Sequence, residues 1–195
     1  MKAVGVLRVG VLMCFAATAC ASDSLGSRND GRLRAFRSPT YGYAIDHDAD
    51  WTVVEATRRL QDGEPPATAS GATDILGRHA GTAVSKMTPP GVIVAAQPVP
   101  SGMDAEQWAS KVVGTVSFMK QCRQPDATEN IGVGGEDAVL LTYEECPEVS
   151  GFLHFWVAVV HGGFGYHIVW FDAPGHTAQD RPALDRMLGS VSFPP

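Results

Sequence analysis

Basic side chains are scarce in this sequence of 195 residues, which has 15 Lys and Arg against 21 Asp and Glu and a net charge of -6. A nucleic-acid-binding protein needs clustered positive charge to neutralise phosphates, so we expect no nucleic-acid partner. A membrane-spanning run is also missing, because the apolar run Val9–Ala19 has only eleven residues. The composition, 45% hydrophobic with 21 Gly, is that of one globular domain.

Short catalytic motifs are absent as well. The sequence has no G-x-S-x-G, no H-E-x-x-H and no Walker lysine. Its one nucleotide-like glycine stretch, residues 132–135, precedes an expected strand, whereas a phosphate loop must open a helix. We therefore predict a turn there, and we expect no enzymatic activity and no cofactor.

Two groups of residues have side chains that can bind metals, but their arrangement in the sequence does not fit a metal site. Asp46, Asp48 and Asp50 imitate the start of a calcium loop, but Trp51 and Thr57 stand where that loop needs Gly and Glu. We interpret the three acids as an acidic turn. In a second group, strand alternation places two of the histidines on opposite faces of a hairpin, so no metal site is predicted from His161, His167, Asp172 and His176.

The N-terminus has the pattern of an export signal. Lys2 and Arg8 precede the apolar run and give a positive N-terminal region, and small residues end the run at Ala19. Two kinds of processing fit: an ordinary signal peptidase after Ala17-x-Ala19, or lipidation of Cys20, since small residues before a cysteine resemble a bacterial lipobox. We predict a signal peptide over residues 1–19.

The cysteine count favours lipidation. Of Cys14, Cys20, Cys122 and Cys146, cleavage before Cys20 removes one and leaves three. An odd cysteine in an exported protein needs an explanation, and a lipid on Cys20 supplies it. We then expect Cys122 and Cys146 to form a disulfide, because export makes oxidation favourable and no C-x-x-C suggests a metal or redox pair.

Residues 20–37 are predicted to be a lipidated flexible tether. They are polar and contain Gly and Ser, which is typical of a linker. Removal of the signal leaves 13 basic and 21 acidic residues, a net charge of -8. Near the lipid, arginines could contact anionic headgroups or merely keep the tether soluble; both roles stay open for Arg28, Arg32, Arg34 and Arg37.

The remainder, residues 38–193, alternates strand and helix patterns. We expect a hairpin from Tyr41–Ile45 and Trp51–Glu55, a loop over 61–73, and strands at Thr82–Met87 and Val92–Val99 around a turn at Pro89–Gly91. Ala105, Trp108, Ala109, Val112 and Val116 share one helical face, with Ser101 and Asp104 as its cap. A strand over Glu136–Cys146 follows.

The C-terminal part contains the clearest signals. Phe152–His161 and Phe164–Phe171 flank Gly162-Gly163, which is typical of a tight hairpin, and both faces of this hairpin are apolar. We expect it to be central in the sheet. A last helix has Leu184, Met187, Leu188 and Val191 on one face, with Thr177 and Asp180 as its cap and Gly189 as its end. These elements predict an α+β fold, an antiparallel sheet flanked by helices.

Three features together resemble one family. They are Tyr41-Gly42-Tyr43-x-Ile45 before Trp51, the pair Cys122 and Cys146, and His161-Gly162-Gly163-x-Gly165-Tyr166-x-Ile168-x-Trp170. This pattern resembles the PsbP-like domain of bacterial envelope lipoproteins, including the LpqN-type lipoproteins of actinobacteria. The resemblance covers about residues 38–193. It implies an α-β-α sandwich that is non-catalytic and binds partners, and no binding site is carried over.

Two functions are therefore expected from the sequence. The first is an exported lipoprotein, anchored to the outer face of the cell membrane by the lipid (a palmitate-type acyl group), whose domain binds an envelope protein partner. The alternative is a carrier of a small apolar ligand such as an envelope lipid, in a cavity between sheet and helix. The residues predicted to line that cavity are Trp108, Trp156, Phe155 and Met187.

Overall fold

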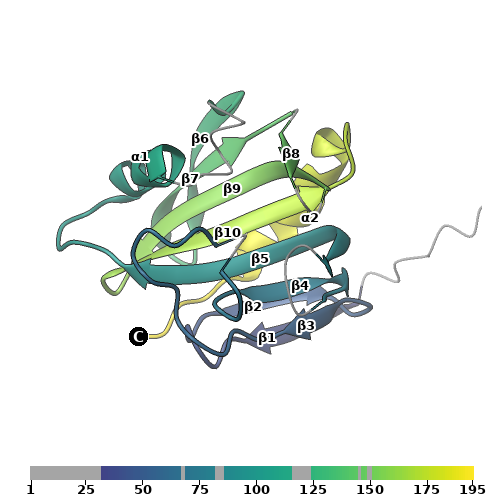
Figure 1. Ribbon diagram of the computed structural model, residues 1–195, viewed down its shortest axis with the longest axis horizontal. Helices are drawn as coiled ribbons and strands as arrows, with labels where there is room; N and C mark the ends of the chain where they lie inside the picture. Colours follow the sequence, from purple (N-terminus) through teal and green to yellow (C-terminus); the bar gives the residue numbers. More distant parts are fainter. Residues whose placement is uncertain (1–31, 67–68, 82–85, 116–123, 145, 149–150) are drawn as a thin grey trace, which may run out of the picture.

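In the residues that it describes, the computed structural model contains one large antiparallel sheet, one two-stranded sheet and two helices (Figure 1). It describes residues 32–66, 69–81, 86–115, 124–144, 146–148 and 151–195. The eight-stranded sheet has the order β3-β4-β5-β10-β9-β7-β6, and β8 pairs with β9 off this path. Its strands are β3 (Thr52–Val54), β4 (Asp74–His79), β5 (Thr88–Pro98), β6 (Ala127–Val133), β7 (Glu136–Thr142), β8 (Pro147–Glu148), β9 (Gly151–His161) and β10 (Phe164–Asp172).

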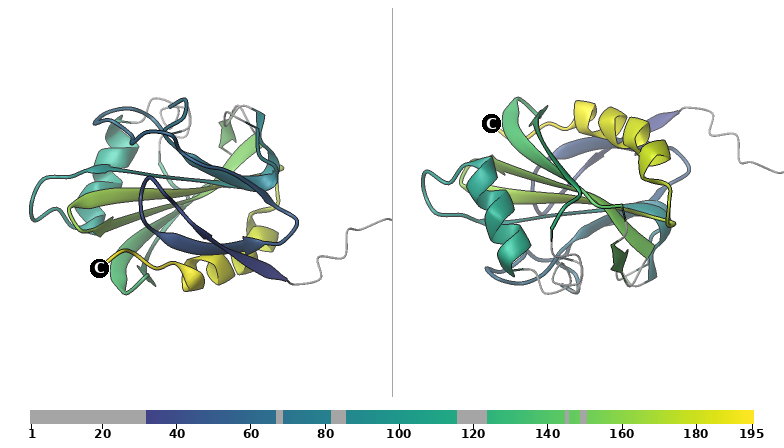
Figure 2. Two further views of the ribbon diagram at one scale, coloured as in Figure 1. Left: turned by 90° about the horizontal axis from the view of Figure 1, so that it is seen from below. Right: turned by 90° about the horizontal axis from the view of Figure 1, so that it is seen from above.

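Other elements cover both faces of this sheet (Figure 2). Each face has its own apolar core. The helix α1 (Ala105–Thr115) lies on one face and packs against β9 and β7. On the other face lie α2 (Thr177–Ser190) and the small sheet of β1 (Leu33–Arg37) and β2 (Ala44–Asp48). The predicted α+β architecture with flanking helices is confirmed.

The central hairpin also follows the prediction. β9 and β10 are joined at Gly162-Gly163, and Val157 pairs with Ile168 and Val159 with Tyr166. Both glycines have positive φ, 57° and 78°, which a tight turn of this kind requires. β5 and β7 flank the hairpin, so its apolar side chains are buried on both faces.

The N-terminal part differs from the prediction. Leu33–Arg37, expected within the flexible tether, forms β1 and pairs with β2, because Phe36 is buried against Tyr43. The strand after it is Ala44–Asp48 and not Tyr41–Ile45, so Asp46 and Asp48 lie in a strand and not in a turn. β3 pairs with β4 and not with β2, hence the predicted hairpin is wrong. The rest of the predicted tether, with Arg28, lies outside the described residues.

A buried carboxylate joins this N-terminal segment to the large sheet. Asp74, at the start of β4, accepts hydrogen bonds from the Tyr43 hydroxyl at 2.9 Å and from the Ala56 N–H at 2.7 Å. Burial raises the pKa of Asp74 above its ordinary value, against the lowering effect of these donors.

The predicted loop 61–73 ends where expected, but the strand that follows it, β4, was not predicted.

Other element boundaries need correction. Pro89–Gly91, predicted as a turn, lies inside β5, and Lys86 and Met87 lie outside any strand, while the remainder of the predicted strand from Thr82 is not described. β6 was not predicted at all. Of the turn predicted over residues 132–135, Gly134 and Gly135 form the turn between β6 and β7, with φ of 62° and 87°, whereas Gly132 and Val133 lie in β6.

Both helix caps differ from the predicted ones. Asp104 caps α1, since its carboxylate accepts the Gln107 N–H at 2.8 Å while the Gln107 side chain accepts the Asp104 N–H at 3.2 Å. In α2 the N-cap is His176, with no side-chain cap hydrogen bond. Asp180 instead bonds His154 on β9. Gly189 does not end α2, which continues to Ser190.

Candidate functional site

A surface groove runs between α1 and the β6–β7 edge of the sheet. It consists of two adjoining cavities of about 520 Å³ and 610 Å³, which share Glu106, Asn130 and Val139. Volumes of this size are within the range of protein binding pockets. The groove is therefore a concave feature of the described residues that is large enough to hold a ligand or a segment of a partner.

The packing of α1 explains why the groove is open. Trp108, Ala109 and Val112 bury one face of the helix against the inner strands of the sheet. β6 lies beyond the reach of these side chains, and it presents Thr128, Asn130 and Gly132 to solvent. These three side chains are polar or small, so nothing from β6 fills the space below the helix.

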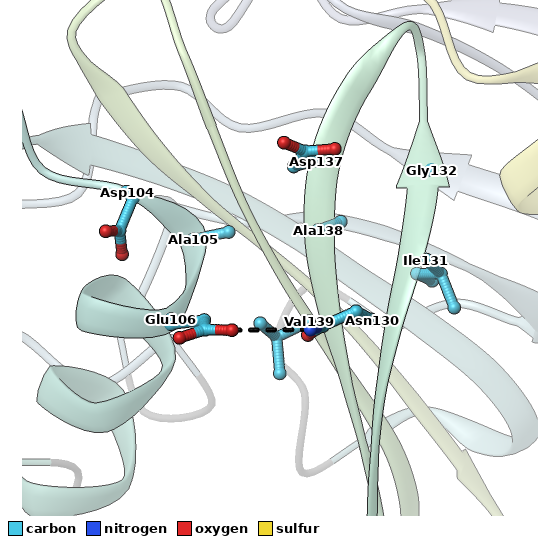
Figure 3. Close-up of a pocket in the computed structure, with 9 residues that line it drawn as sticks. All are labelled: Asp104, Ala105, Glu106, Asn130, Ile131, Gly132, Asp137, Ala138 and Val139. Atoms are coloured by element: carbon cyan, nitrogen blue, oxygen red, sulfur yellow. Dashed lines mark hydrogen bonds between the residues drawn. The ribbon is translucent and has the colours of Figure 1, made fainter.

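Carboxylates border the groove on both sides. Asp104 and Glu106 stand at the first turn of α1, and Asp137 stands opposite them on β7 (Figure 3). All three are exposed. Glu106 accepts a hydrogen bond from the Asn130 side chain at 3.3 Å, which joins the two walls across the groove. The rim is negative, and the floor contains the apolar Val139.

The outer edge of β6 carries no further strand in the described part of the chain. β6 pairs with β7 on one side and is the last strand of the sheet. Arg181 of α2 holds β6 from the opposite face, through two hydrogen bonds to Glu129 at 2.7 Å and 3.1 Å. This guanidinium keeps the pKa of Glu129 below its ordinary value. The edge is thus exposed and also fixed in position.

The predicted cavity for an apolar ligand does not form. Trp108 and Trp156 belong to the core under α1, whereas Phe155 and Met187 belong to the core on the opposite face of the sheet. All four are buried, and the sheet separates the two pairs. Because neighbouring residues of a strand point to opposite faces, Phe155 and Trp156 cannot line one cavity.

The predicted cysteine sites are mostly outside the described residues. Cys20 and Cys122 are not described. Cys146 is 1% exposed and packs in the core under α1, close to the start of β8. The pairing of Cys122 with Cys146 therefore stays a prediction.

The four metal-type residues separate as expected, except for one pair. His161 bonds Glu136 at 2.8 Å and the Pro194 carbonyl at 2.7 Å. His167 lies under α1, on the opposite face. Only Asp172 and His176 approach each other, at 3.3 Å. No group of three or more metal-ligating side chains is found in the described ranges.

Sequence reasoning missed a buried polar cluster beside Asp172. The register of β9 and β10 skips His154, which places this residue in a bulge. Its Nδ1 lies 2.7 Å from the Asp180 carboxylate, and Asp180 also contacts Asp172. Burial and the neighbouring carboxylate raise the pKa of Asp172. The signal in the sequence that could have indicated this cluster is a single histidine, His154, within a long apolar strand.

His167 occupies a different environment under α1. Its ring lies 4.8 Å from that of Trp108 and 5.3 Å from that of Trp156, and neither ring nitrogen has a hydrogen-bond partner among the described residues. Burial lowers the pKa of His167 to about 3. The imidazole is neutral at ordinary pH and acts as a core side chain.

No helix in the described ranges is both long and apolar enough to cross a bilayer. No family model and no curated protein matches the chain. Among solved structures, the chain is similar to the solution structure of cyanobacterial PsbP (CyanoP) from Synechocystis sp. PCC 6803, with a TM-score of 0.55 and 14% identity over 88% of this chain and 98% of that one.

A second similar structure is a protein from Bacteroides thetaiotaomicron VPI-5482. The TM-score is 0.47 and the identity 8%, over 78% of this chain and 45% of that one, and we draw no inference from it. At this identity the similarity to CyanoP concerns the fold alone. The chain has a PsbP-like α+β fold.

Proposed function

We propose that this protein is an envelope lipoprotein of the LpqN-like type whose domain binds a protein partner through the groove beside α1. The observation that carries the proposal is the combination of that groove with a carboxylate rim and a sheet edge to which no other described strand pairs. The occupant is an extended, basic segment of the partner, which adds to β6 as a further strand.

Strand addition suits the geometry of this edge. A sheet edge offers unpaired N–H and C=O groups along its length, and an extended peptide satisfies them with its own backbone. β6 has seven residues, a normal length for a strand. Because Arg181 holds β6 to α2, a partner need not order this strand when it binds.

Charge complementarity selects a basic segment. Every second side chain of the added strand would point to the α1 face, where Asp104, Glu106 and Asp137 lie. Lysines or arginines at those positions meet three carboxylates, and Val139 contributes apolar contact below them. The chain's net charge of -6 adds long-range attraction for the same partner.

The membrane anchor is a lipid on Cys20. Twelve residues, 21–32, separate this cysteine from β1. Fully extended, they span at most about 40 Å, so the domain stays close to the bilayer surface. In this proposal the arginines of this segment contact anionic headgroups. A disulfide between Cys122 and Cys146 is what we expect of an exported protein.

Peptide binding tests the groove. We would titrate the ¹⁵N-labelled chain with an extended peptide of alternating lysine and valine, and with a glutamate–valine peptide of the same length. Only the lysine peptide should bind, with shifts at the Asn130 and Gly132 amides and with affinity that falls as salt rises. Each rim contact contributes about 0.2–1 kcal/mol, so the double variant Glu106→Lys/Asp137→Lys should weaken binding about 2- to 30-fold.

The matched control for this experiment is Glu55→Lys, which reverses an exposed acid next to β3 at the far edge of the sheet. It should leave the affinity unchanged. Equal binding of both peptides, or equal loss in Glu55→Lys, would refute the groove as the docking site. A photo-crosslinking residue at position 130, compared with one at position 55, then identifies the partner in intact cells.

The anchor has a separate test. Mass spectrometry of the mature N-terminus should find a diacylglyceryl group on Cys20, and Cys20→Ser should release the protein from the membrane fraction. Cys14→Ser is the matched control, because Cys14 lies within the predicted signal peptide and should leave anchoring intact. A mature Cys20 without lipid would contradict the proposed anchor and would not affect the proposal that the groove binds a partner.

A further inference from the structure

A smaller pocket lies at the opposite face of the sheet from the groove, beside the β9–β10 turn. It has a volume of about 300 Å³ and is lined mainly by aromatic and proline side chains with one arginine. Segments far apart in the sequence form it: the N-terminal loop, the loop after β3, the β9–β10 turn and the C-terminal residues. The side chains that matter here are Tyr41, Arg59, Phe164, Tyr166 and Pro194.

Arg59 is the unusual member of this set. It is exposed, its guanidinium lies 4.8 Å from the centre of the Phe164 ring, and it forms no ion pair with any described residue. Its neighbour Arg58, by contrast, is bonded to both carboxylate oxygens of Glu64. Stacking on the ring leaves the guanidinium N–H donors of Arg59 available to an anion.

The other polar groups of the pocket are already occupied. The Tyr41 hydroxyl donates to the Ala72 carbonyl and accepts the Leu60 N–H at 3.0 Å. Burial raises the pKa of Tyr41 to about 12, so it stays protonated. The Tyr166 hydroxyl donates to the Tyr41 carbonyl at 3.2 Å. Tyr41 and Tyr166 are both buried, and these bonds fix their rings in position at the floor of the pocket.

The C-terminal wall is fixed in the same manner. Both nitrogens of His161 are engaged, one with Glu136 and one with the Pro194 carbonyl. Its ring stacks on Phe193 with centroids 4.9 Å apart. A ligand therefore meets rigid apolar walls and one unneutralised cation, and this arrangement costs little reorganisation on binding.

We propose that this pocket binds a small aromatic carboxylate: a flat body of one or two rings lies among the tyrosine, phenylalanine and proline side chains, and its carboxylate pairs with Arg59. The planar guanidinium matches a carboxylate with two parallel hydrogen bonds. The ring stacks against the aromatic floor. A ligand of this size in an open pocket should bind with a Kd of about 0.1–1 mM.

The test uses 2-naphthoate and its neutral counterpart 2-naphthamide as probes. We would titrate each into the ¹⁵N-labelled full chain and follow the amides of Gly162, which lines the pocket, and of its neighbour Gly163. Naphthoate should shift these amides and bind at least fivefold more tightly than naphthamide. Arg59→Gln should remove this preference, while Arg59→Lys should retain part of it.

The matched control is Arg78→Gln, which removes another exposed arginine near Asp50, outside the pocket residues. It should bind naphthoate as the parent chain does. Equal affinity for acid and amide, no shift at Gly162, or unchanged binding in a folded Arg59→Gln variant would overturn the proposal. So would inorganic phosphate that saturates the same amides as tightly as naphthoate, because that result describes a simple anion site.

Discussion

Replacing Gly165 with alanine should destabilise the domain by about 2–4 kcal/mol. Gly165 lies on β10, directly beneath the indole of Trp108 on α1. A Cβ at this position would lie 2.4 Å from Cε2 and 2.6 Å from Cδ2 of that ring. These separations are far below van der Waals contact, so either the ring or the strand must move.

Trp108 has little freedom to move. Its Nε1 donates to the Tyr166 carbonyl at 3.1 Å, and the side chain is 1% exposed. Overpacking of a close-packed core costs about 1–3 kcal/mol. Loss of the indole hydrogen bond adds about 1 kcal/mol. The sum gives the expected range, and the first consequence is a shift of α1 away from the sheet.

Urea unfolding measures this effect. With a slope of about 2 kcal/mol per molar urea, the midpoint should fall by about 1–2 M. Gly132→Ala is the control, because a Cβ there meets nothing within 4 Å, and its midpoint should change little. In a Trp108→Leu background, Gly165→Ala should cost about 1 kcal/mol or more less than in the parent. A loss below about 1 kcal/mol in the parent would refute the contact.

Three further predictions concern buried polar groups and one helix. The folded-state pKa of His167, about 3, lies below the unfolded value, so this residue should cost the parent about 1.4 kcal/mol of stability per pH unit as pH falls below about 6.5. His167→Leu should remove this contribution, so in urea titrations from pH 6.5 to 4.5 the parent should lose stability more steeply than the variant by this amount. Asp172→Asn should raise stability at pH 7, because the raised pKa of Asp172 gives stability that is lost as pH rises above the unfolded pKa. His154→Ala should instead lower stability by about 3–5 kcal/mol, because it leaves Asp180 buried without its partner, and equal effects of the two substitutions in thermal unfolding would contradict this. Gly189→Ala should stabilise α2 by about 0.5–1 kcal/mol, since its Cβ meets nothing within 4 Å, and a lower Tm would argue against it.

The central hairpin could be predicted from the sequence because three local signals coincide there. Two apolar runs flank a pair of glycines, and the register follows from the turn once its position is known. β1 and β6 lack such signals. β1 buries only Phe36, and β6 places polar side chains along an exposed edge, so neither has the alternation that identifies a strand.

The groove could not be predicted, for a related reason. Its walls come from α1, β6 and β7, and its opening depends on how far the helix reaches across the sheet.

The wrong prediction of the α2 cap has a different cause. Thr177 and Asp180 have the spacing of a capping box, but the bulge at His154 offers the Asp180 carboxylate a buried partner across the fold. A tertiary contact therefore replaces the local one.

The two proposed sites should act independently, although consecutive residues of β7 serve them. Glu136 points to the face of His161, the wall of the small pocket, and Asp137 points to the groove. Because adjacent strand residues face opposite sides, the sheet itself separates the two carboxylates. Neither site requires a side chain of the other, and their charges are coupled only through a screened interaction.

This separation gives a quantitative expectation. Saturation with 2-naphthoate should change the Kd of the lysine–valine peptide by less than about twofold, and Arg59→Gln should leave peptide binding unchanged. Isothermal titration of the peptide with and without naphthoate measures both. A change of tenfold or more would require that the two faces move together, and it would contradict a sheet whose hairpin is packed on both sides by buried side chains.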